Sequence, residues 1–299
     1  MKKILITGAG PNGITGRLIK EYFEDKYVLL TPSSKELDLT NHDSVAYFFD
    51  QNIVDYVIHC ATFRPTSVDK SHFVDEELES NLRMFYSLVA QSSKFEKMIY
   101  FGSGAEFDKS RDIVDITEEE FGQRIPSGKY GFAKYIMNEY ARKSDNVYNF
   151  RLFGTINKYE RYTKNVISNL CAKAIKGMSL QLQQDCRFSF VDINDVLPLL
   201  DFALNNELKY HDYNIVMNQS YLLSDIARII IELSGRNQKI EIVKSGLNME
   251  YTASNRRANA EFPLNFTAIE ESIERVYTYY KQSQDYIDID NIDARWKQK

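Results

Sequence analysis

Short apolar runs alternate with segments of helical periodicity over the first half of the chain. Continuous apolar runs are typical of strands covered on both faces, and they predict strands at residues 3–7, 27–31, 37–39, 55–60, 97–102 and 147–152. Between them, apolar positions recur at the helical period, which predicts helices at residues 14–23, 41–49, 76–90 and 130–141. This alternation indicates an α/β fold with a doubly wound parallel sheet.

The alternation becomes less regular after about Gly154. Here we expect short strands at residues 188–191 and 213–216, and helices at residues 165–175, 193–204, 222–233 and 268–280. The helix at residues 193–204 is expected to return to the main sheet. We therefore predict a first domain at residues 1–155, joined by residues 188–205, and a smaller C-terminal α/β lobe at residues 156–299.

The composition mainly excludes classes of protein. The 299 residues include 42 acidic and 37 basic side chains, a formal net charge of −5, and no basic block, so neither nucleic acid nor an anionic membrane is expected as a partner. A hydrophobic content of 43% excludes a disordered or fibrous chain. No apolar run approaches the roughly 20 residues of a membrane helix, and the run after Met1 is too short for a signal peptide.

The three cysteines, Cys60, Cys171 and Cys186, lie far apart and form no CxxC pair. This spacing supports neither a disulfide framework nor a zinc site, and none of the four histidines completes a metal site. Few, unpaired cysteines fit a reducing compartment. We therefore expect a cytoplasmic protein that binds no metal.

A glycine-rich loop joins the first predicted strand to the first helix. Its glycines satisfy the pattern GxGxxG and extend it by one, at Gly8, Gly10, Gly13 and Gly16. Glycine permits a tight turn and close approach of the backbone to a pyrophosphate, which the free N–H groups of the helix start at Ile14 can bind. The loop predicts a dinucleotide site at these five residues, and the alternative is an ordinary glycine-rich turn.

The end of the second predicted strand indicates which dinucleotide is bound. NAD sites usually place an acidic residue there for the ribose 2′-hydroxyl, but Thr31-Pro32-Ser33-Ser34-Lys35 contains none. Hydroxyls such as Ser33 together with Arg17, just after the glycine loop, suit a 2′-phosphate and favour NADPH. Alternatively, Arg17 and Lys35 are solvated surface charges. Asp38-Leu39 lies where an adenine edge is read.

A second motif, Tyr130-Gly131-Phe132-Ala133-Lys134, begins a predicted helix. The i,i+4 spacing places Tyr130 and Lys134 on one helix face, where the ammonium group lowers the pKa of the phenol. Ser103 follows a predicted strand, at the sheet edge where ligands of such folds bind, and its hydroxyl can orient a carbonyl oxygen. The alternative is two surface residues on a helix and a loop serine.

Together these motifs resemble the extended short-chain dehydrogenase/reductases of the NAD(P)-dependent epimerase/dehydratase family, which act on nucleotide sugars. The resemblance extends over nearly the whole chain and includes Ile58-His59-Cys60-Ala61, Asn81, Arg151-Leu152-Phe153, Phe188-Ser189-Phe190-Val191 and Asp195. It implies a Rossmann domain with Ala61 in the cofactor site, a C-terminal lobe that binds the nucleoside diphosphate, and a homodimer. It also implies that Ser103 and Tyr130 bind and protonate the substrate carbonyl oxygen and that Lys134 binds the nicotinamide ribose.

Within this family the chain is most similar to the GDP-L-fucose synthase branch, in the run from Ser34 to Thr40 and in the pair Gly102-Ser103. That branch also epimerises, with a cysteine two residues after the serine and a histidine in the sugar lobe. Here Ala105 stands at the first position and Asn165 at the second. Dehydratases carry Asp-Glu directly after the catalytic hydroxyl residue, where this chain has Gly104-Ala105.

We therefore expect NADPH-dependent reduction of the C4 keto group of a 4-keto-6-deoxy sugar, GDP-linked, without epimerisation at C3 or C5. One alternative is an NAD-dependent 4-epimerase, and another is a non-catalytic NADP-sensing regulator. Substrate contacts are expected from Ser103, Asn165 and Arg187, and the alternative for Arg187 is a surface arginine. We expect the remaining polar candidates to be structural or solvated: a packed or backbone-bonded His59, a water-facing Glu106, and a solvated basic pair in Asn255-Arg256-Arg257.

Overall fold

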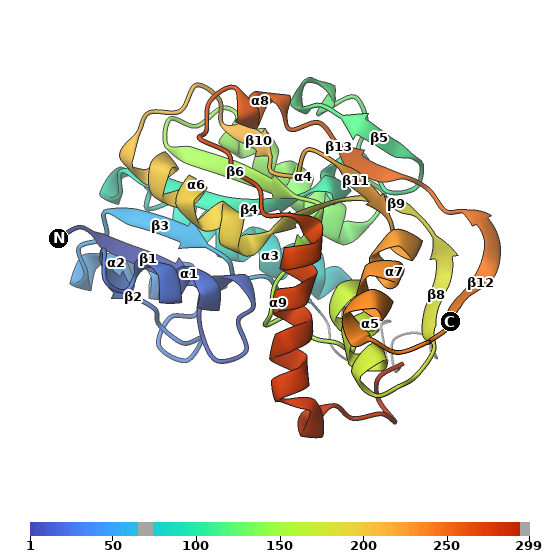
Figure 1. The fold of residues 1–299 in the computed structure, drawn as a ribbon. Helices are drawn as coiled ribbons and strands as arrows, with labels where there is room; N and C mark the ends of the chain where they lie inside the picture. Colours follow the sequence, from blue (N-terminus) through green and yellow to red (C-terminus); the bar gives the residue numbers. More distant parts are fainter. Residues whose placement is uncertain (65–73, 294–299) are drawn as a thin grey trace.

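The computed structural model describes residues 1–64 and 74–293 (Figure 1). Its main sheet is parallel throughout, and its strands lie in the order β10 (Asp212–Asn214), β6 (Val147–Leu152), β4 (Lys97–Ser103), β3 (Tyr56–His59), β1 (Lys3–Thr7) and β2 (Val28–Leu30). Because all strands run the same way, their carboxyl ends meet at one edge. Thr7, His59 and Ser103 are the last residues of β1, β3 and β4 at this edge.

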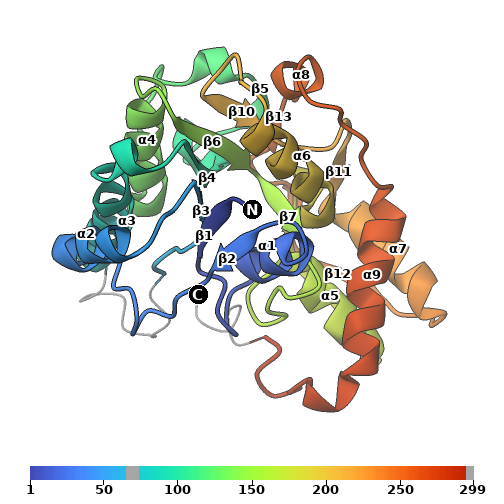
Figure 2. The same cartoon turned by 90° about the vertical axis from the view of Figure 1, so that its left-hand side faces the viewer.

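Helices cover both faces of this sheet, as Figure 2 shows. One face packs on α1 (Thr15–Phe23) and α6 (Ile193–Asn205), and the other on α2 (His42–Gln51), α3 (Val74–Val89) and α4 (Lys129–Ala141). Side chains alternate along β1, so Ile4 and Ile6 join the first core while Leu5 joins the second. This arrangement confirms the predicted doubly wound α/β fold.

The rest of the chain builds a smaller lobe. Its larger sheet has the order β11 (Ser220–Leu222), β9 (Arg187–Asp192), β13 (Tyr251–Ala253) and β5 (Ile113–Ile116), with β7 (Gly154–Ile156) also paired to β9. Two further strands, β8 (Leu180–Asp185) and β12 (Ile240–Leu247), pair with each other. The helices of this part are α5 (Val166–Ile175), α7 (Leu223–Ser234) and α9 (Ile269–Gln282), whereas α8 (Arg256–Asn259) packs beside β10 of the main sheet. The 3-10 helices among the described residues are η1 (Ser92–Lys94), η2 (Gly104–Phe107), η3 (Glu118–Glu120) and η4 (Gln284–Tyr286).

The chain passes between the two parts more than once. β5 lies in the smaller lobe although it precedes residue 155, and β10 completes the main sheet although it follows residue 205. Helix α6 packs against α1, as expected for a segment that returns to the first domain. The division at residue 155 remains a prediction about folding units.

One predicted strand is wrong. Residues 37–39 form no strand but follow a turn at residues 34–36, in which the amides of Glu36 and Leu37 both donate to the carbonyl of Ser33. Asp38 then accepts from the amide and hydroxyl of Thr40, while Leu37 is buried in the core. The prediction was wrong because this short apolar run is buried without pairing to a strand. By contrast, of the two residues that the sequence offers as a cap for α2, Thr40 and Asn41, Asn41 caps the helix by accepting from the amide of Ser44.

Within residues 1–64 and 74–293, no helix is both long and apolar enough to cross a membrane. In the same part of the chain, no three His, Cys, Asp or Glu side chains lie together in a way that could hold a metal ion.

Candidate active site

The glycine loop forms a tight connection between β1 and α1. Gly8 adopts a φ of +70°, and a Cβ there would lie 2.8 Å from the amide nitrogen of Ala61. A Cβ at Gly16 would lie 2.6 Å from the carbonyl oxygen of Gly8, and one at Gly13 would overlap the same oxygen. Only glycine allows the loop to fold back this closely. Gly10 has no atom within 4 Å of a Cβ, so packing leaves space beside it.

The start of α1 is held by the segment that follows β7. The side-chain amide of Asn157 donates to the carbonyl of Ile14 at 3.2 Å. The glycine loop, the start of α1 and Ala61, two residues after β3, therefore lie together and form a cradle. A phosphate that approached it would meet free N–H groups at a helix N-terminus.

His59, at the end of β3, is a structural residue, although its partner is a side chain rather than the backbone. The hydroxyl of Thr7 accepts from the amides of Cys60 and Ala61, so its own proton goes to Nδ1 of His59 at 2.8 Å. Burial, followed by the charge of Lys134, lowers the pKa of His59 to about 3. The imidazole is therefore neutral near pH 7.

Arg17 lies on the exposed side of α1. Its guanidinium stacks 3.8 Å from the ring centre of Tyr159 and lies 3.4 Å from the carboxylate of Glu21. Ser33 donates its amide to Glu36, so a carboxylate does lie close to the turn after β2. The two residues proposed for a 2′-phosphate thus each have an acidic neighbour.

A buried carboxylate, that of Glu106, binds the backbone of Ser103. Glu106 accepts from the amide of Ser103 at 2.9 Å and from Nε of Arg151 at 2.7 Å. The hydroxyl of Ser103 in turn accepts from the amide of Ala105 at 3.2 Å, which completes a capping box over η2. The expectation that Glu106 faces water is wrong, because both Glu106 and Arg151 are 0% exposed.

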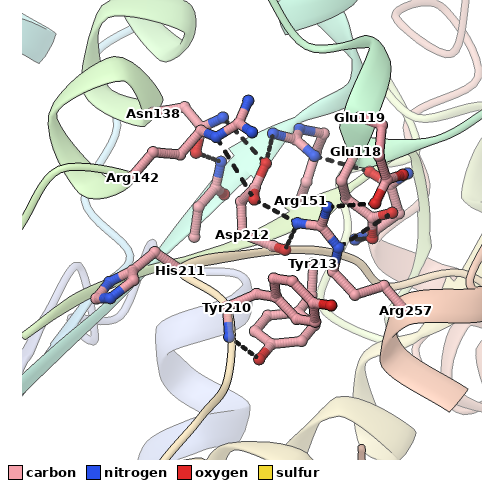
Figure 3. A network of polar contacts seen from close by, with 12 residues as sticks. Glu118, Glu119, Asn138, Arg142, Arg151, Tyr210, His211, Asp212, Tyr213 and Arg257 are labelled. Atoms are coloured by element: carbon pink, nitrogen blue, oxygen red, sulfur yellow. Dashed lines mark hydrogen bonds and ion pairs between the residues drawn. The ribbon is translucent and has the colours of Figure 1, made fainter. Parts of the chain in front are cut away.

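Figure 3 shows the polar network that continues behind Arg151. Arg151 also donates to Asp212 on β10, and Asp212 accepts from Arg257 at 2.7 Å. Arg257 further pairs with Glu119 at 2.6 Å, so the expectation that this arginine is solvated is wrong as well. A cavity of about 610 Å³ opens beside the network, lined by Glu118, Glu119, Tyr210, Arg256, Arg257 and Glu261 among others. Ser103, Tyr130 and Lys134 do not line it.

Tyr130 and Lys134 lie on α4 beside the end of β4. The ammonium of Lys134 donates to the carbonyl of Phe101 at 2.8 Å and lies 6.0 Å from the ring centre of Tyr130. Burial acts to raise the pKa of Tyr130, but the charges of Lys134 and Arg64 and hydrogen bonds with Arg64 and Ser103 outweigh it and lower that pKa. The structure thus brings Ser103, Tyr130 and Lys134 together.

Two further residues of this cluster were missed from the sequence. Arg64, just after β3, stacks 4.0 Å from the ring centre of Tyr130 and remains partly in solvent. Tyr251, on β13, forms a hydrogen bond with the hydroxyl of Ser103 and is 4% exposed. Neither belongs to a local motif, and β13 reaches the site only through its pairing with β9 and β5.

The two other proposed substrate residues lie in the smaller lobe. Asn165 is the residue before α5, and its side chain makes no capping hydrogen bond to that helix. Arg187 begins β9 and donates to the carbonyl of Ser220 on the neighbouring strand at 3.3 Å. Neither observation tests a substrate contact, so the proposed roles of Asn165 and Arg187 in substrate binding stay predictions.

Comparison with known proteins places this site in a family. A model described as "NAD dependent epimerase/dehydratase family" matches residues 4–216. The chain belongs to this family. Its sequence is 23% identical over 255 residues to the GDP-L-colitose synthase of Yersinia pseudotuberculosis, over 78% of this chain and 82% of that protein.

Solved structures of similar proteins have the same fold as this epimerase/dehydratase family member. The GDP-mannoheptose C4 reductase MlghC of Campylobacter jejuni, with NADP bound, superposes with a TM-score of 0.79 at 17% identity, covering 94% of this chain and 98% of that chain. A GDP-L-fucose synthetase of Naegleria fowleri, bound to NADP, superposes with a TM-score of 0.81 at 18% identity, covering 95% and 94%. At these identities the likeness shows the fold alone.

Proposed function

We propose that this protein reduces the C4 keto group of a GDP-linked 4-keto-6-deoxy sugar with NADPH. The observation that supports this most directly is the cluster of Ser103, Tyr130 and Lys134 at the carboxyl edge of the parallel sheet. A phenol with a lowered pKa beside a serine hydroxyl suits the protonation of a carbonyl oxygen. The named activities of the Yersinia, Campylobacter and Naegleria relatives, all on GDP-linked sugars, support the same substrate class.

The cradle fits a dinucleotide. Gly8, Gly13 and Gly16 allow a tight turn in which a side chain would collide with neighbouring backbone, Gly10 has open space beside it, and the helix start at Ile14 offers N–H groups to a pyrophosphate. Asp38, Leu39 and Ala61 would border the adenosine half, and Arg17 with Ser33 would contact a 2′-phosphate. Lys134 would bind the nicotinamide ribose. When bound, the cofactor supplies the hydride.

The residues of this chain would then handle the oxygen and its proton. Ser103 donates a hydrogen bond that orients the sugar carbonyl, and Tyr130 passes its proton to the oxygen as negative charge develops there. Lys134 stabilises the resulting phenolate. The smaller lobe, with Arg187 and Asn165, is assigned to the nucleotide sugar.

Among residues 1–64 and 74–293, the groups that we considered near Ser103 are poorly suited to removing a carbon-bound proton, which supports reduction without epimerisation. Ala105 has no titratable group, and the side chain of Asn165 does not exchange protons near neutral pH. His59 stays neutral because its pKa is about 3, and burial raises the pKa of the Cys60 thiol well above its usual value. Neither group is suited to removing a carbon-bound proton.

An assay in D₂O tests the proposed reaction. The enzyme is given a GDP-linked 4-keto-6-deoxy sugar and NADPH, and the product is examined by NMR. We expect oxidation of NADPH and a product with no enzyme-dependent deuterium at C3 or C5. Deuterium at either carbon would refute reduction without epimerisation, and failure to oxidise NADPH with any nucleotide-linked keto sugar would refute reduction itself.

A second candidate is a 4-epimerase with tightly bound NAD. The ion pair between Arg17 and Glu21 favours it, because that carboxylate offsets the positive charge available for a 2′-phosphate. The two enzymes differ in their use of the cofactor. A reductase consumes one equivalent of NADPH per product, whereas an epimerase turns over without net oxidation. A homodimer in the cytoplasm remains the expected state of either enzyme.

A further inference from the structure

Tyr251 approaches the proposed catalytic serine from the smaller lobe. Its ring is held between the rings of Phe153 and Phe188, at centroid distances of 4.7 and 4.8 Å. The ammonium of Lys109 lies 4.0 Å from the centre of the same ring. Packing and strand pairing therefore fix where the hydroxyl of Tyr251 lies.

Gly104 makes this approach possible. A Cβ at Gly104 would lie 2.6 Å from the hydroxyl oxygen of Tyr251 and would overlap the ring of Phe153. The residue after Ser103 must therefore lack a side chain if Tyr251 is to reach the serine. Tyr251 and Gly104 are therefore in close contact, although they are far apart in sequence.

The hydrogen bonds around Ser103 determine where its proton points. A hydroxyl oxygen accepts two hydrogen bonds and donates one. The amide of Ala105 occupies one acceptor site of Ser103, at 3.2 Å. Burial raises the pKa of Tyr251 far above neutrality, so its hydroxyl keeps a proton that it can donate to the second acceptor site of Ser103. In that arrangement the serine's own proton is left for Tyr130 or for a substrate oxygen.

We propose that Tyr251 is a positioning residue, whose hydroxyl holds Ser103 in the orientation that donates to the reacting oxygen. The inference rests on the proposed reductase function and adds a residue from the smaller lobe to it. Tyr251 acts only through Ser103. Loss of the Tyr251 hydroxyl should therefore lower kcat when Ser103 is present and leave kcat nearly unchanged when the serine hydroxyl has been removed.

A double-mutant cycle tests this dependence. Tyr251→Phe keeps the ring and its packing, and we expect it to lower kcat about 10-fold or more with the Kd for NADPH within about twofold. In a Ser103→Ala background the same change is expected to lower kcat less than about twofold. A purely structural role would lower kcat equally in both backgrounds, and that result, or an unchanged kcat in the first, would overturn the proposal.

A second measurement needs no substrate. NMR titration of protein labelled with ¹³C at the tyrosine Cζ atoms reports the pKa of Tyr130, assigned by Tyr130→Phe. Tyr251→Phe should raise this pKa when Ser103 is present and leave it unchanged in Ser103→Ala, and a matching effect in both backgrounds would contradict us. Tyr213→Phe, which removes a buried hydroxyl bonded to Glu261, is the matched control and should change neither rate nor titration. If no keto sugar is reduced, the proposed function fails, while this titration still decides the role of Tyr251.

Discussion

The carboxylate of Glu106 and the guanidinium of Arg151 form an ion pair of 2.7 Å in which neither side chain is exposed to solvent. The pair links β6 to the turn that follows Ser103, and Glu106 in that turn also accepts from the amide of Ser103. Asn149 adds a hydrogen bond to the same carboxylate, and Asp212 shares the guanidinium. A buried charge network thus supports the backbone of the proposed catalytic serine.

Removal of Arg151 should destabilise the whole protein. In Arg151→Met, Glu106 remains buried without its cation while Asp212 keeps its pair with Arg257, and an unpaired buried charge typically costs about 3–5 kcal/mol in the free energy of unfolding. Urea denaturation followed by circular dichroism measures the loss. Arg228→Met, which breaks an exposed pair with Asp225, is the control and should cost less than about 1 kcal/mol. Equal effects of the two changes would show that the buried network does not stabilise the fold.

Tyr130→Phe should nearly abolish turnover. The hydroxyl acts on the oxygen that becomes charged in the transition state, and loss of such a donor typically lowers kcat by about 10²-fold or more. NADPH binding, measured by fluorescence titration, should change only a few-fold. Tyr135→Phe, on the same helix with its ring stacked on Phe121, is the control and should leave kcat unaltered. A Tyr130→Phe enzyme with more than about half of the original rate would exclude Tyr130 as the acid.

Arg64 should influence the pH dependence of the reaction. Its positive charge helps lower the pKa of Tyr130, so Arg64→Met should raise that pKa. Reduction requires protonated Tyr130 and is lost as the pH rises through its pKa, so the descending limb of the rate profile should move to higher pH. Solvent screens Arg64, and the shift should be smaller than the one caused by Lys134→Met. Arg83→Met is the control, and an unmoved limb in Arg64→Met would contradict the prediction.

NADPH should bind at least roughly tenfold more tightly than NADH, a difference of about 1.4 kcal/mol. Arg17→Ala should reduce this ratio, because Arg17 is the cation that directly follows the glycine loop in the chain. Fluorescence titration with both cofactors measures the ratio, and Lys20→Ala, one turn along α1, is the control. Equal affinities in the unmodified protein would instead favour the 4-epimerase with bound NAD.

Glu160 should make the folded protein less stable as the pH rises. Burial raises the pKa of Glu160 to about 8 from an ordinary value of 4.5, so the folded state keeps a proton that the unfolded state releases. Between about pH 4.5 and 8, each pH unit should therefore lower the free energy of unfolding by up to roughly 1.4 kcal/mol. Glu160→Gln should remove this slope, whereas Glu139→Gln, at an exposed pair with Lys143, should not. A slope unchanged in Glu160→Gln would refute the assignment.

Much of the fold could be predicted because its signals are local. Apolar runs and helical periodicity are properties of neighbouring residues, so the parallel strands and their covering helices were correctly expected. The strand predicted at residues 37–39 was wrong for the same reason, because a short apolar run can be buried beside a turn as well as in a strand. The glycine loop and Tyr130 with Lys134 are also local motifs, with spacings that identify one turn or one helix face.

Only the tertiary structure decided what surrounds Ser103. Glu106 is three residues from the serine, yet its burial depends on Arg151 and Asp212, which reach it across parallel strands. Tyr251 arrives from a strand 148 positions later in the chain, between two strands that are themselves distant in sequence. Strand pairing and charge burial are contacts between remote segments, and no pattern of neighbouring residues encodes them. The sequence therefore determined the type of fold and the local motifs, while packing between remote segments determined how the serine is held.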